Sequence, residues 1–528
     1  MPPTGADVPD TREVEFKLRS RAPIDGGAVE RVLRELGIDA RPSESAVHVD
    51  LYLDDARRSL VRRGIGLRLR RRAGDAILCV KQRGTVRGAL HVRSELEAPW
   101  PAEPPDSAPG DQPPQRALEL PERLRDAVEP FVLDRRLETL AMLEVRRELR
   151  DLRRDGVLLG ELAIDIVTAR ARDRTTVFAE LEIEVRDDLP ACERIARRLL
   201  EAEPLLAASE DKLAWSLHTL GLMPPPLAPN RPSHPTSLGD ALSAAMQDLT
   251  ARLLTAEAAA RVRGGVEDIH ELRVCLRRLR VLVRAFRAAW PASEAARADL
   301  ALTNLGRELS GLRDRDVLCA RLPRALEHLP PALRAGGDDL RALLQSNRDA
   351  LVQRARESLR SPAHREDLAR LESMGQRASM LHDVAGQPAA ALARVLRRAV
   401  RACRDDLRSL DQDTPQDQVH RARLRLKRLR ILLEELTPRR KRGRARRRLV
   451  RAIDRLGIAC DHDAAGRHHL ALLHQTAPTE LPPRLAALLG ALVTWHRDGL
   501  VAARAAALRA TQRLDRRRIW RSLRDPQA

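Results

Sequence analysis

The pattern of hydrophobic and polar residues changes once along the chain, at a proline-rich segment over residues 221–236. Before this segment, several stretches alternate apolar and charged residues with period two, which is typical of half-buried β-strands. After it, Leu, Ala and Arg dominate at helical spacing. The pattern therefore predicts an α+β domain over residues 8–220, a linker over 221–236 and an all-α domain over 237–528.

The first alternating stretch, residues 12–18, places Glu13, Glu15 and Lys17 on one face of a strand and apolar residues on the other. Such a face is compatible with a solvated surface, or with a divalent cation held beside an anion. Later strands carry similar charged faces: Arg68, Arg70 and Arg72; Arg93, Glu95 and Glu97; Glu180, Glu182 and Glu184.

Strands of this kind form either an exposed amphipathic sheet or a closed barrel in which the charged faces meet. Charges inside a barrel must be paired, or matched by ions and ligand. Carboxylates hold hard cations such as Mg²⁺ or Mn²⁺, while Arg and Lys bind phosphate oxygens. A polyanion together with a divalent cation would satisfy both signs of charge.

The overall charge of the chain also favours an anionic partner. The 528 residues carry a formal net charge of +20, with a pI near 11.0. Aromatic residues make up only 2%, which disfavours nucleic-acid binding by base stacking. The six cysteines include no CxxC pair, and we see neither a signal peptide nor a run of 18 apolar residues. We therefore expect a cytoplasmic protein with no membrane partner.

The charged strands resemble a known family. Glu13-x-Glu15-x-Lys17 is similar to the ExExK signature of the CYTH domain, the triphosphate tunnel metalloenzymes. The resemblance continues in order along residues 11–220 through the following positions: Arg68-x-Arg70, Lys81, Arg93-x-Glu95-x-Glu97, Arg146, Asp165, Glu180-x-Glu182-x-Glu184 and Lys212. It implies a closed antiparallel eight-stranded β-barrel that binds a triphosphate in its tunnel. Asp211 departs from the family, where Ser is common, and this puts the local helix packing in question.

The resemblance also implies roles for individual residues. Glu97 and Glu184 would balance charge or order the arginines. The metal ligands would be Glu13, Glu15, Asp165, Glu180 and Glu182. The substrate-binding residues would be Lys17, Arg68, Arg70, Lys81, Arg93, Arg146 and Lys212. The catalytic residues would be Glu13, Glu15, Lys17, Lys81 and Arg146.

The implied activity is Mg²⁺- or Mn²⁺-assisted hydrolysis of a terminal phosphoanhydride without a phosphoenzyme. No His stands out on these strands as a general base, and phosphoryl transfer depends mainly on positioning and charge neutralisation. Few aromatics are available for an organic substrate, which favours inorganic triphosphate. The alternatives are thiamine triphosphate, an RNA 5′-triphosphate, a nucleotide as in an adenylyl cyclase, a non-enzymatic polyphosphate-binding scaffold, and a nucleic-acid-binding protein.

The second half contains an internal repeat. Residues 269–280 recur at 419–430, and each copy is followed by an Asp-x-Asp pair, at Asp314 and Asp316 and at Asp461 and Asp463. The repeat predicts two similar helical bundles, over about 237–385 and 386–515. The Asp-x-Asp pairs would position arginines, cap helices or, with the histidines, hold a metal.

Each copy places a histidine and three cations on one side of a helix, with leucines toward the core. This face is either solvated or an anion-binding surface, and its repetition favours the second. It resembles the CHAD domain over about 237–515, which implies polyphosphate binding through these residues: His270, Arg273, Arg277, Arg280, His420, Arg423, Lys427 and Arg430. The two histidines could instead be neutral packing residues. A further basic run over 439–448 is either a solvated segment or an added polyanion contact.

Overall fold

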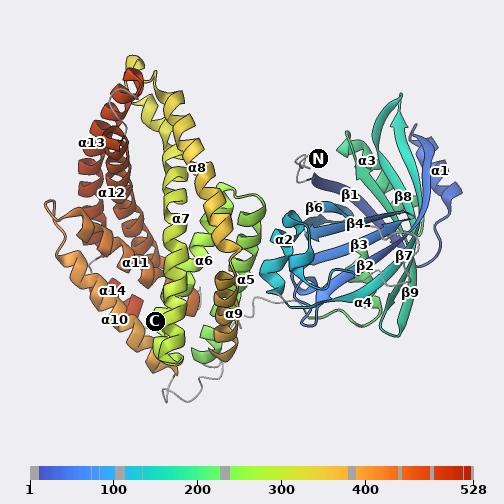
Figure 1. Ribbon diagram of the computed structural model, residues 1–528, viewed down its shortest axis with the longest axis horizontal. Coiled ribbons are helices and arrows are strands. Elements are labelled where there is room, and N and C mark those ends of the chain that lie inside the picture. Colours follow the sequence, from blue (N-terminus) through green and yellow to red (C-terminus); the bar gives the residue numbers. More distant parts are fainter. Residues whose placement is uncertain are drawn as a thin grey trace. The chain divides into compact units, whose positions relative to one another are not determined.

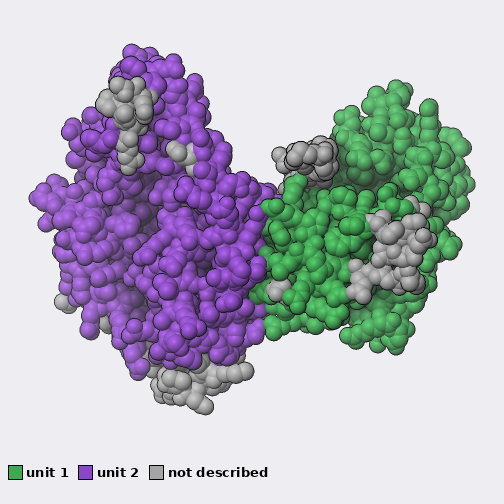
Figure 2. Space-filling model, viewed as in Figure 1, with its two compact units in different colours: residues 1–228 green, residues 229–528 purple. Residues whose placement is uncertain are grey.

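The computed structural model describes residues 11–72, 74–82, 84–101, 113–133, 135–225, 238–378, 388–437, 443–475, 481–514 and 517–524. The chain forms two compact units, Met1–Ala228 and Pro229–Ala528, which Figure 2 colours separately. Residues 226–236 of the predicted linker lie outside the described residues. None of the described helices is long and apolar enough to cross a membrane.

Unit 1 is built around a closed antiparallel β-barrel (Figure 1). Around the barrel the strands follow the order β1, β9, β8, β7, β2, β3, β4 and β6, and β6 pairs again with β1. Two short strands, β5 (Thr85–Arg87) and β10 (Leu206–Ala207), pair with β6 and β1. The predicted eight-stranded barrel is thus confirmed. Its strands are β1 (Thr11–Ser20), β2 (Asp39–Asp55), β3 (Ile65–Arg72), β4 (Asp75–Gln82), β6 (Leu90–Trp100), β7 (Leu137–Arg154), β8 (Val157–Ala171) and β9 (Arg174–Val185).

Two helices cover the outer face of the barrel at β1, β8 and β9. Helices α1 (Gly26–Glu35) and α3 (Leu189–Ala202) pack against the apolar residues of these strands, such as Leu18, Leu162 and Leu181, all fully buried. Burial of each such leucine contributes roughly 1.5–3 kcal/mol. Because neighbouring residues of a strand point to opposite sides, this packing turns the charged residues of the same strands into the barrel.

A further helix, α4 (Lys212–Thr219), packs against the inner face near one end of the barrel. Leu213 and Leu217 of this helix join a buried cluster with Val145, Val167 and Phe178, from β7, β8 and β9. The inner face is therefore apolar beside α4 and charged farther along the same strands. The remaining helix of unit 1 is α2 (Glu122–Val132).

Unit 2 is helical throughout its described residues, which confirms the predicted all-α second domain. The two copies of the repeat lie on α6 and α11, and a long helix follows each of them. Leu272, Leu276 and Leu279 of α6 and Leu426 and Leu429 of α11 are buried, on the side expected from their spacing. The helices are α5 (Leu238–Val262), α6 (Val266–Ala285), α7 (Ala292–Glu327), α8 (Gly337–Leu359), α9 (Pro362–Arg377), α10 (Pro388–Arg408), α11 (Gln416–Leu436), α12 (Gly443–Gln475), α13 (Pro483–Leu514) and α14 (Arg517–Arg524).

Candidate functional site

The inner face of the barrel encloses a cavity of about 510 Å³. Most of its lining side chains are charged, and both signs are present. The cations are Lys17, Arg68, Arg70, Arg72, Lys81, Arg93, Arg147, Arg186 and Lys212. The carboxylates are Glu13, Glu15, Glu95, Glu97, Glu161, Glu182, Glu184 and Asp211.

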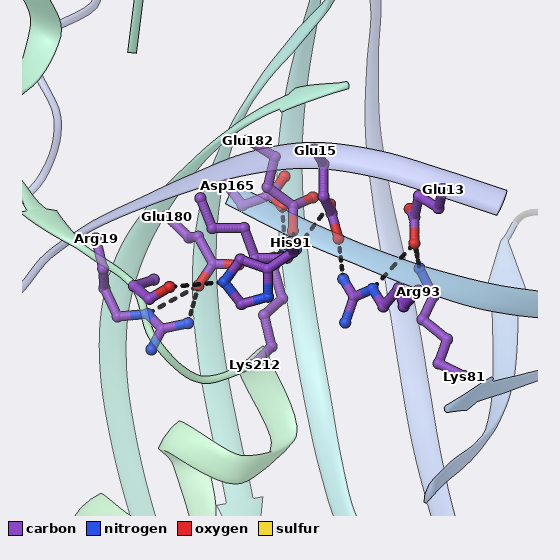
Figure 3. A network of polar contacts seen from close by, with 12 residues as sticks. Glu13, Glu15, Arg19, Lys81, His91, Arg93, Asp165, Glu180, Glu182 and Lys212 are labelled. Atoms are coloured by element: carbon purple, nitrogen blue, oxygen red, sulfur yellow. Dashed lines mark hydrogen bonds and ion pairs between the residues drawn. The ribbon is translucent and has the colours of Figure 1, made fainter. Parts of the chain in front are cut away.

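Two lysines, Lys17 and Lys212, contact the same buried carboxylates, and Figure 3 shows Lys212 beside Glu180 and Asp165. The Lys212 ammonium is 2.9 Å from Glu180 Oε1 and 2.6 Å from Glu182 Oε1, and 3.0 Å from Asp165. The Lys17 ammonium contacts Glu182 as well and is 3.6 Å from Glu180 Oε1. Burial, and to a lesser extent the nearby Lys212, lowers the pKa of Lys17 to about 8. Two ammonium groups thus share one set of buried carboxylates.

A second group of ion pairs joins β1 to β4 and β6. Arg93 donates to Glu15 and, through Nε, to Glu13 Oε2 at 3.1 Å. Lys81 lies 3.1 Å from the same Glu13 oxygen and 3.0 Å from Glu95 Oε2. Burial alone would raise the pKa of Glu15, but Lys17 and Arg93 lower it to about 2. These carboxylates are therefore ionised at neutral pH.

Asp50 on β2 orients two of the cavity arginines, and we did not predict it from the sequence. It accepts hydrogen bonds from Arg70 Nε at 2.8 Å and Arg70 Nη2 at 3.0 Å, and from Arg68 Nη1 at 3.4 Å. Its side chain is fully buried. Burial would raise the pKa of Asp50, but Arg68 and Arg70 hold it well below its usual range. The sequence signal for it is the alternation over residues 47–53, which places Asp50 on the same face as His48 and Tyr52.

We predict that Asp50→Asn lowers the stability of unit 1 by about 3 kcal/mol at pH 7, because it leaves buried arginines without their carboxylate. A depressed pKa means that the stabilisation is present above about pH 4 and is lost as the pH falls below it. The variant should therefore lose less stability than wild type between pH 5 and pH 3. Hydrogen–deuterium exchange of β2 and β3 in the full chain measures both effects.

The matched control is Asp39→Asn on the same strand, whose exposed carboxylate pairs with Arg41. It should change stability by less than about 0.5 kcal/mol. Equal effects of the two substitutions would contradict the assignment of Asp50.

Asp211 caps the helix that carries Lys212. Its carboxylate accepts a hydrogen bond from the backbone N–H of Ala214 at 2.8 Å. Asp and Ser are equally good at this position, since either supplies an oxygen to the first turn of a helix. The departure at Asp211 therefore leaves α4 normally capped, with Lys212 at its first residue.

Two histidines that received no role, His48 and His91, are also buried in the barrel. Burial, with Arg70 as the next cause, lowers the pKa of His48 to about 3. The Nε2 atom of His91 lies 2.6 Å from the carbonyl oxygen of Ala208, so this nitrogen carries a proton and donates. His48 therefore stays neutral near pH 7, and the hydrogen bond holds His91 to the backbone.

In unit 2, the two copies of the repeat bring their cations together between α6 and α11. Arg277 lies near Arg423 and Arg430 of the other copy, and Lys427 lies near Arg277 and Arg423. Burial and this mutual repulsion lower the pKa of Arg277 to about 10 and that of Lys427 to about 8. Among the described residues, neither Arg277 nor Lys427 has a carboxylate within ion-pair distance.

The nearest carboxylate to these cations, Asp461, is engaged elsewhere. It is 2.6 Å from Arg321 Nη2 on α7 and 3.8 Å from Arg423 Nη2. The guanidinium of Arg423 lies against Gly457 of α12, where a Cβ would approach Nη2 to 3.1 Å. The cluster of Arg277, Arg423 and Lys427, here called the basic cluster, thus carries excess positive charge that the neighbouring side chains do not neutralise.

Known families match both units. The CYTH domain matches residues 11–216 and the CHAD domain matches residues 244–469. The chain is a CYTH domain followed by a CHAD domain. An uncharacterized protein of Mycobacterium tuberculosis is 29% identical over 304 residues, which are 54% of this chain and 55% of that protein. The chain thus spans about half the length of this relative.

Two solved structures are similar to parts of the chain. The CHAD domain from Ricinus communis is 24% identical, with a TM-score of 0.44, over 51% of this chain and 91% of that one. HpAC1 from Hippeastrum, named as a putative adenylyl cyclase with a dominant triphosphatase activity, is 18% identical, with a TM-score of 0.30, over 41% of this chain and 99% of that one. At these values the two structures add no argument to the family matches.

Arg146, predicted as a substrate-binding and catalytic residue of the CYTH domain, does not line the cavity, so this prediction is wrong. Its side chain is 70% exposed on the outer face of β7, beside Glu144. The next residue, Arg147, faces the cavity and donates to both oxygens of Asp165, at 2.7 and 2.6 Å, and to Glu182 at 2.6 Å. The other predicted substrate-binding residues all line the cavity.

The five predicted metal ligands of the CYTH domain are placed at two depths. Glu13, Glu15 and Glu182 line the cavity, whereas Asp165 and Glu180 are absent from its lining and fully buried. Glu180 accepts a hydrogen bond from Arg19 Nε at 2.8 Å. The five are not gathered around one point, because ammonium groups lie between them. In the described part of the chain, one group of three donors is close enough to share an ion: Cys79, Glu95 and Glu97. The five predicted ligands nevertheless offer carboxylate oxygens, which are the ligands that Mg²⁺ and Mn²⁺ prefer, so their donor atoms fit these cations.

Some of the predicted polyphosphate-binding residues of the CHAD domain are engaged by other residues of the domain. Arg273 donates to Gly306 O and Ser310 Oγ of α7, and Arg280 donates to Asp299. Burial lowers the pKa of both His270 and His420, with Arg313 the next cause for His270 and Arg423 for His420, so the two histidines tend to be neutral.

The basic run over residues 439–448 is only partly described, since residues 438–442 lie outside the described residues. In its second half, at the start of α12, Arg446 pairs with Glu434 at 2.9 Å. Arg448 donates to the carbonyl oxygen of Arg513 at 3.4 Å. At least these two cations are therefore engaged within the unit.

Proposed function

We propose that the protein hydrolyses a triphosphate, with inorganic triphosphate as the substrate and diphosphate and phosphate as the products. The observation that carries this proposal is a closed barrel whose cavity of about 510 Å³ is lined by cations and carboxylates together. A site that only bound an anion would have no use for the carboxylates. A site that combines both charges can hold phosphate oxygens and a divalent cation side by side.

The cations of the cavity bind and orient the substrate. Seven of them surround the space, from strands β1, β3, β4, β6 and β7 and from helix α4, and each can donate to phosphate oxygens. Asp50 fixes the direction of Arg68 and Arg70, so these two arginines need little reordering when substrate binds. The proposed phosphate-binding residues are Lys17, Arg68, Arg70, Lys81, Arg93, Arg147 and Lys212.

Mg²⁺ or Mn²⁺ would be held by Glu13, Glu15 and Glu182, with Asp165 and Glu180 as neighbours. When bound, the cation would neutralise phosphate oxygens and make water more acidic. Lys17 and Lys212 now share Glu180 and Glu182, so substrate phosphates would offer the two ammonium groups new partners. Hydrolysis would proceed by positioning and charge neutralisation, without a histidine base.

The cavity offers few apolar side chains for the recognition of an organic group, because most of its lining residues are charged. Among the described residues that line the cavity, the aromatic one is Tyr52, and it is buried in the cluster beside α4. Recognition of a nucleoside or thiamine normally needs a larger apolar or aromatic pocket. Inorganic triphosphate therefore fits the lining better than ATP or thiamine triphosphate.

A substrate panel tests the proposal. The full chain is assayed with Mg²⁺ or Mn²⁺ and inorganic triphosphate, thiamine triphosphate, ATP or long-chain polyphosphate, and phosphate release and cyclic AMP are measured. We expect fastest release from inorganic triphosphate and none in excess EDTA. Cyclic AMP from ATP would instead indicate a cyclase, and no turnover of any compound would leave a binding scaffold.

We also propose that the CHAD domain binds polyphosphate at the basic cluster, since Arg277 and Lys427 are part-buried cations that have no ion-pair partner in the described part of the chain. Arg277→Gln combined with Lys427→Gln should weaken polyphosphate binding by about 10- to 100-fold at low salt, and less at high salt. Isothermal titration calorimetry on the full chain measures this change. Titration of duplex DNA separates this proposal from nucleic-acid binding, which predicts similar affinities for both polymers.

The control for this pair removes the same net charge elsewhere. Arg341 and Arg370 each pair with an aspartate three residues away, on α8 and α9. Arg341→Gln combined with Arg370→Gln should weaken binding by less than about threefold. An equal loss in both double variants would mean that net charge alone holds the polymer.

A further inference from the structure

Lysine is rare in this chain and is found at particular places. Of the 95 lysines and arginines, five are lysine: Lys17, Lys81, Lys212, Lys427 and Lys441. Three of them line the cavity of the CYTH domain, and Lys427 belongs to the basic cluster. Nearly every cation of the chain is arginine. At the few positions with lysine, the side chain supplies what arginine lacks, namely a compact ammonium group that can lose its proton.

Lys427 differs from the lysines of the cavity in its partners. The ammonium groups of Lys17, Lys81 and Lys212 each lie within 3.1 Å of a carboxylate oxygen. Of the four lysines in the described ranges, Lys427 alone has no carboxylate within ion-pair distance. It is also partly exposed, whereas Lys17 is 2% exposed. An outside reagent can therefore reach Lys427.

The residues around Lys427 disfavour its ammonium form. Arg277 of α6 and Arg423 of α11 repel it, while Asp461 and Cys460 of α12 are the groups that favour its charge. Asp461 is already engaged by Arg321 at 2.6 Å. Burial, followed by Arg423 and Arg277, lowers the pKa of Lys427 to about 8. With this pKa, roughly a tenth of the amine is neutral at pH 7, far more than for a free lysine, and the neutral amine is the nucleophile.

The same arginines are suited to hold the phosphate group of a reagent. The guanidinium groups of Arg277 and Arg423 can donate to phosphate oxygens. Among the described residues, Arg277 has no carboxylate within ion-pair distance, and Arg423 has Asp461 at 3.8 Å. In the first copy of the repeat, the position that corresponds to Lys427 is occupied by Arg277. The helix therefore accepts arginine at this position, and the nucleophile is specific to the second copy.

We propose that Lys427 is a site of acylation by acyl phosphates, with the phosphate group of the donor held by Arg277 and Arg423. The neutral Nζ atom attacks the carbonyl carbon of the donor, so that an N–C bond forms and the C–O bond to phosphate breaks. The phosphate leaves with the electron pair and takes the proton released by the amine. The products are an Nε-acyl-lysine and inorganic phosphate, and the basic cluster loses one positive charge.

The inference shares the basic cluster with the proposed polyphosphate binding but does not depend on it, nor on hydrolysis in the CYTH domain. A cluster that fails to retain a polymer can still orient a small donor. The two proposals are also measured differently, by covalent mass and by binding heat. Failure of one therefore leaves the other standing.

The test compares an anionic with a neutral acyl donor. The full chain is incubated at pH 7.5 and low salt with acetyl phosphate or with p-nitrophenyl acetate, and acetylation at position 427 is followed by peptide mass spectrometry. Relative to Nα-acetyl-lysine methylamide, Lys427 should react at least about tenfold faster with acetyl phosphate. Its preference for acetyl phosphate over p-nitrophenyl acetate should exceed that of the model amine.

Two variants complete the design. Lys427→Arg should keep the charge of the cluster and abolish acetylation at this position. Arg277→Gln changes the basicity of the Lys427 amine, and this change affects the rates with both acyl donors equally. A fall in the ratio of the rate with acetyl phosphate to the rate with p-nitrophenyl acetate therefore reports the loss of phosphate recognition. Reaction of Lys427 no faster than the model amine, or an unchanged donor preference in Arg277→Gln, would overturn the proposal.

Discussion

Replacement of Glu182 by glutamine is expected to reduce metal-dependent phosphate release from inorganic triphosphate by about 100- to 1000-fold. Glu182 lines the cavity and is the carboxylate that Lys17, Arg147 and Lys212 share. Its loss removes a proposed metal ligand and also the anchor of three phosphate-binding cations. Steady-state phosphate release at saturating Mg²⁺ measures the loss of kcat.

The fold of this variant and a control from the same barrel are needed to interpret the result. Circular dichroism should show an intact barrel, since the three cations keep other carboxylates, such as Glu180 and Asp165. Glu148→Gln removes an exposed carboxylate from β7, with 62% of the side chain accessible, and should change kcat by less than about twofold. A folded Glu182→Gln protein with near wild-type turnover would exclude a role of Glu182 in the reaction.

Arg147→Ala is expected to lower kcat/KM for inorganic triphosphate by about 100-fold, whereas Arg146→Ala should leave it within about twofold. The two residues are neighbours, but Arg147 faces the cavity and Arg146 is 70% exposed on the outside. A guanidinium–phosphate contact in a buried site is worth about 2–3 kcal/mol, which corresponds to this factor. The measurement is a substrate titration of each variant.

Arg147→Lys distinguishes loss of charge from loss of geometry. It keeps a cation beside Asp165 and Glu182 but not the forked contact, and should recover part of the activity. A large effect of Arg146→Ala with none for Arg147→Ala would restore the assignment made from the sequence. Equal effects would mean that β7 acts through stability rather than through substrate contact.

The error at Arg146 has a physical cause that is instructive for the whole barrel. Arg146 was assigned from the family resemblance, and the face of a residue was otherwise inferred from the rule that apolar residues of a strand face outward and charged residues face inward. On β7 this is true only in part, because α4 packs against the inner face and makes it apolar at Val145. Residues 145 and 147 share that face, so the inner side changes from apolar to charged within two residues. Arg146 lies on the outer face of β7, where its charge is exposed to solvent and does not have to be paired inside the barrel.

Asp50 was missed for a related reason. The sequence around it alternates with period two over residues 47–53, but a single aspartate carries no motif that assigns it a partner. Its role follows from the pairing of β2 with β3, in which Asp50 lies directly opposite Arg70. Such a cross-strand pair depends on the register of two strands, which local sequence patterns do not specify.

The sequence by itself determined the classes of structure and the kinds of chemistry. Period-two alternation predicted strands with one ionised face but left an exposed sheet and a closed barrel both open, and the resemblance to the CYTH family selected the barrel. The repeated helical pattern was enough for the all-α domain. Most of the charged residues that line the cavity could be listed in advance, because their strands bury an apolar outer face. Their roles in binding and catalysis remain predictions.

Only the tertiary structure decided which charges meet. It placed Lys17 and Lys212 among the carboxylates, turned Arg147 inward in place of Arg146, and put Asp165 and Glu180 beneath the cavity lining. It also brought Arg277 and Lys427, 150 positions apart in the sequence, into one basic cluster. These outcomes depend on strand register, on the packing of α4 and on the contact of α6 with α11. Such long-range contacts are set by the packing of the whole fold, and no short stretch of sequence records them.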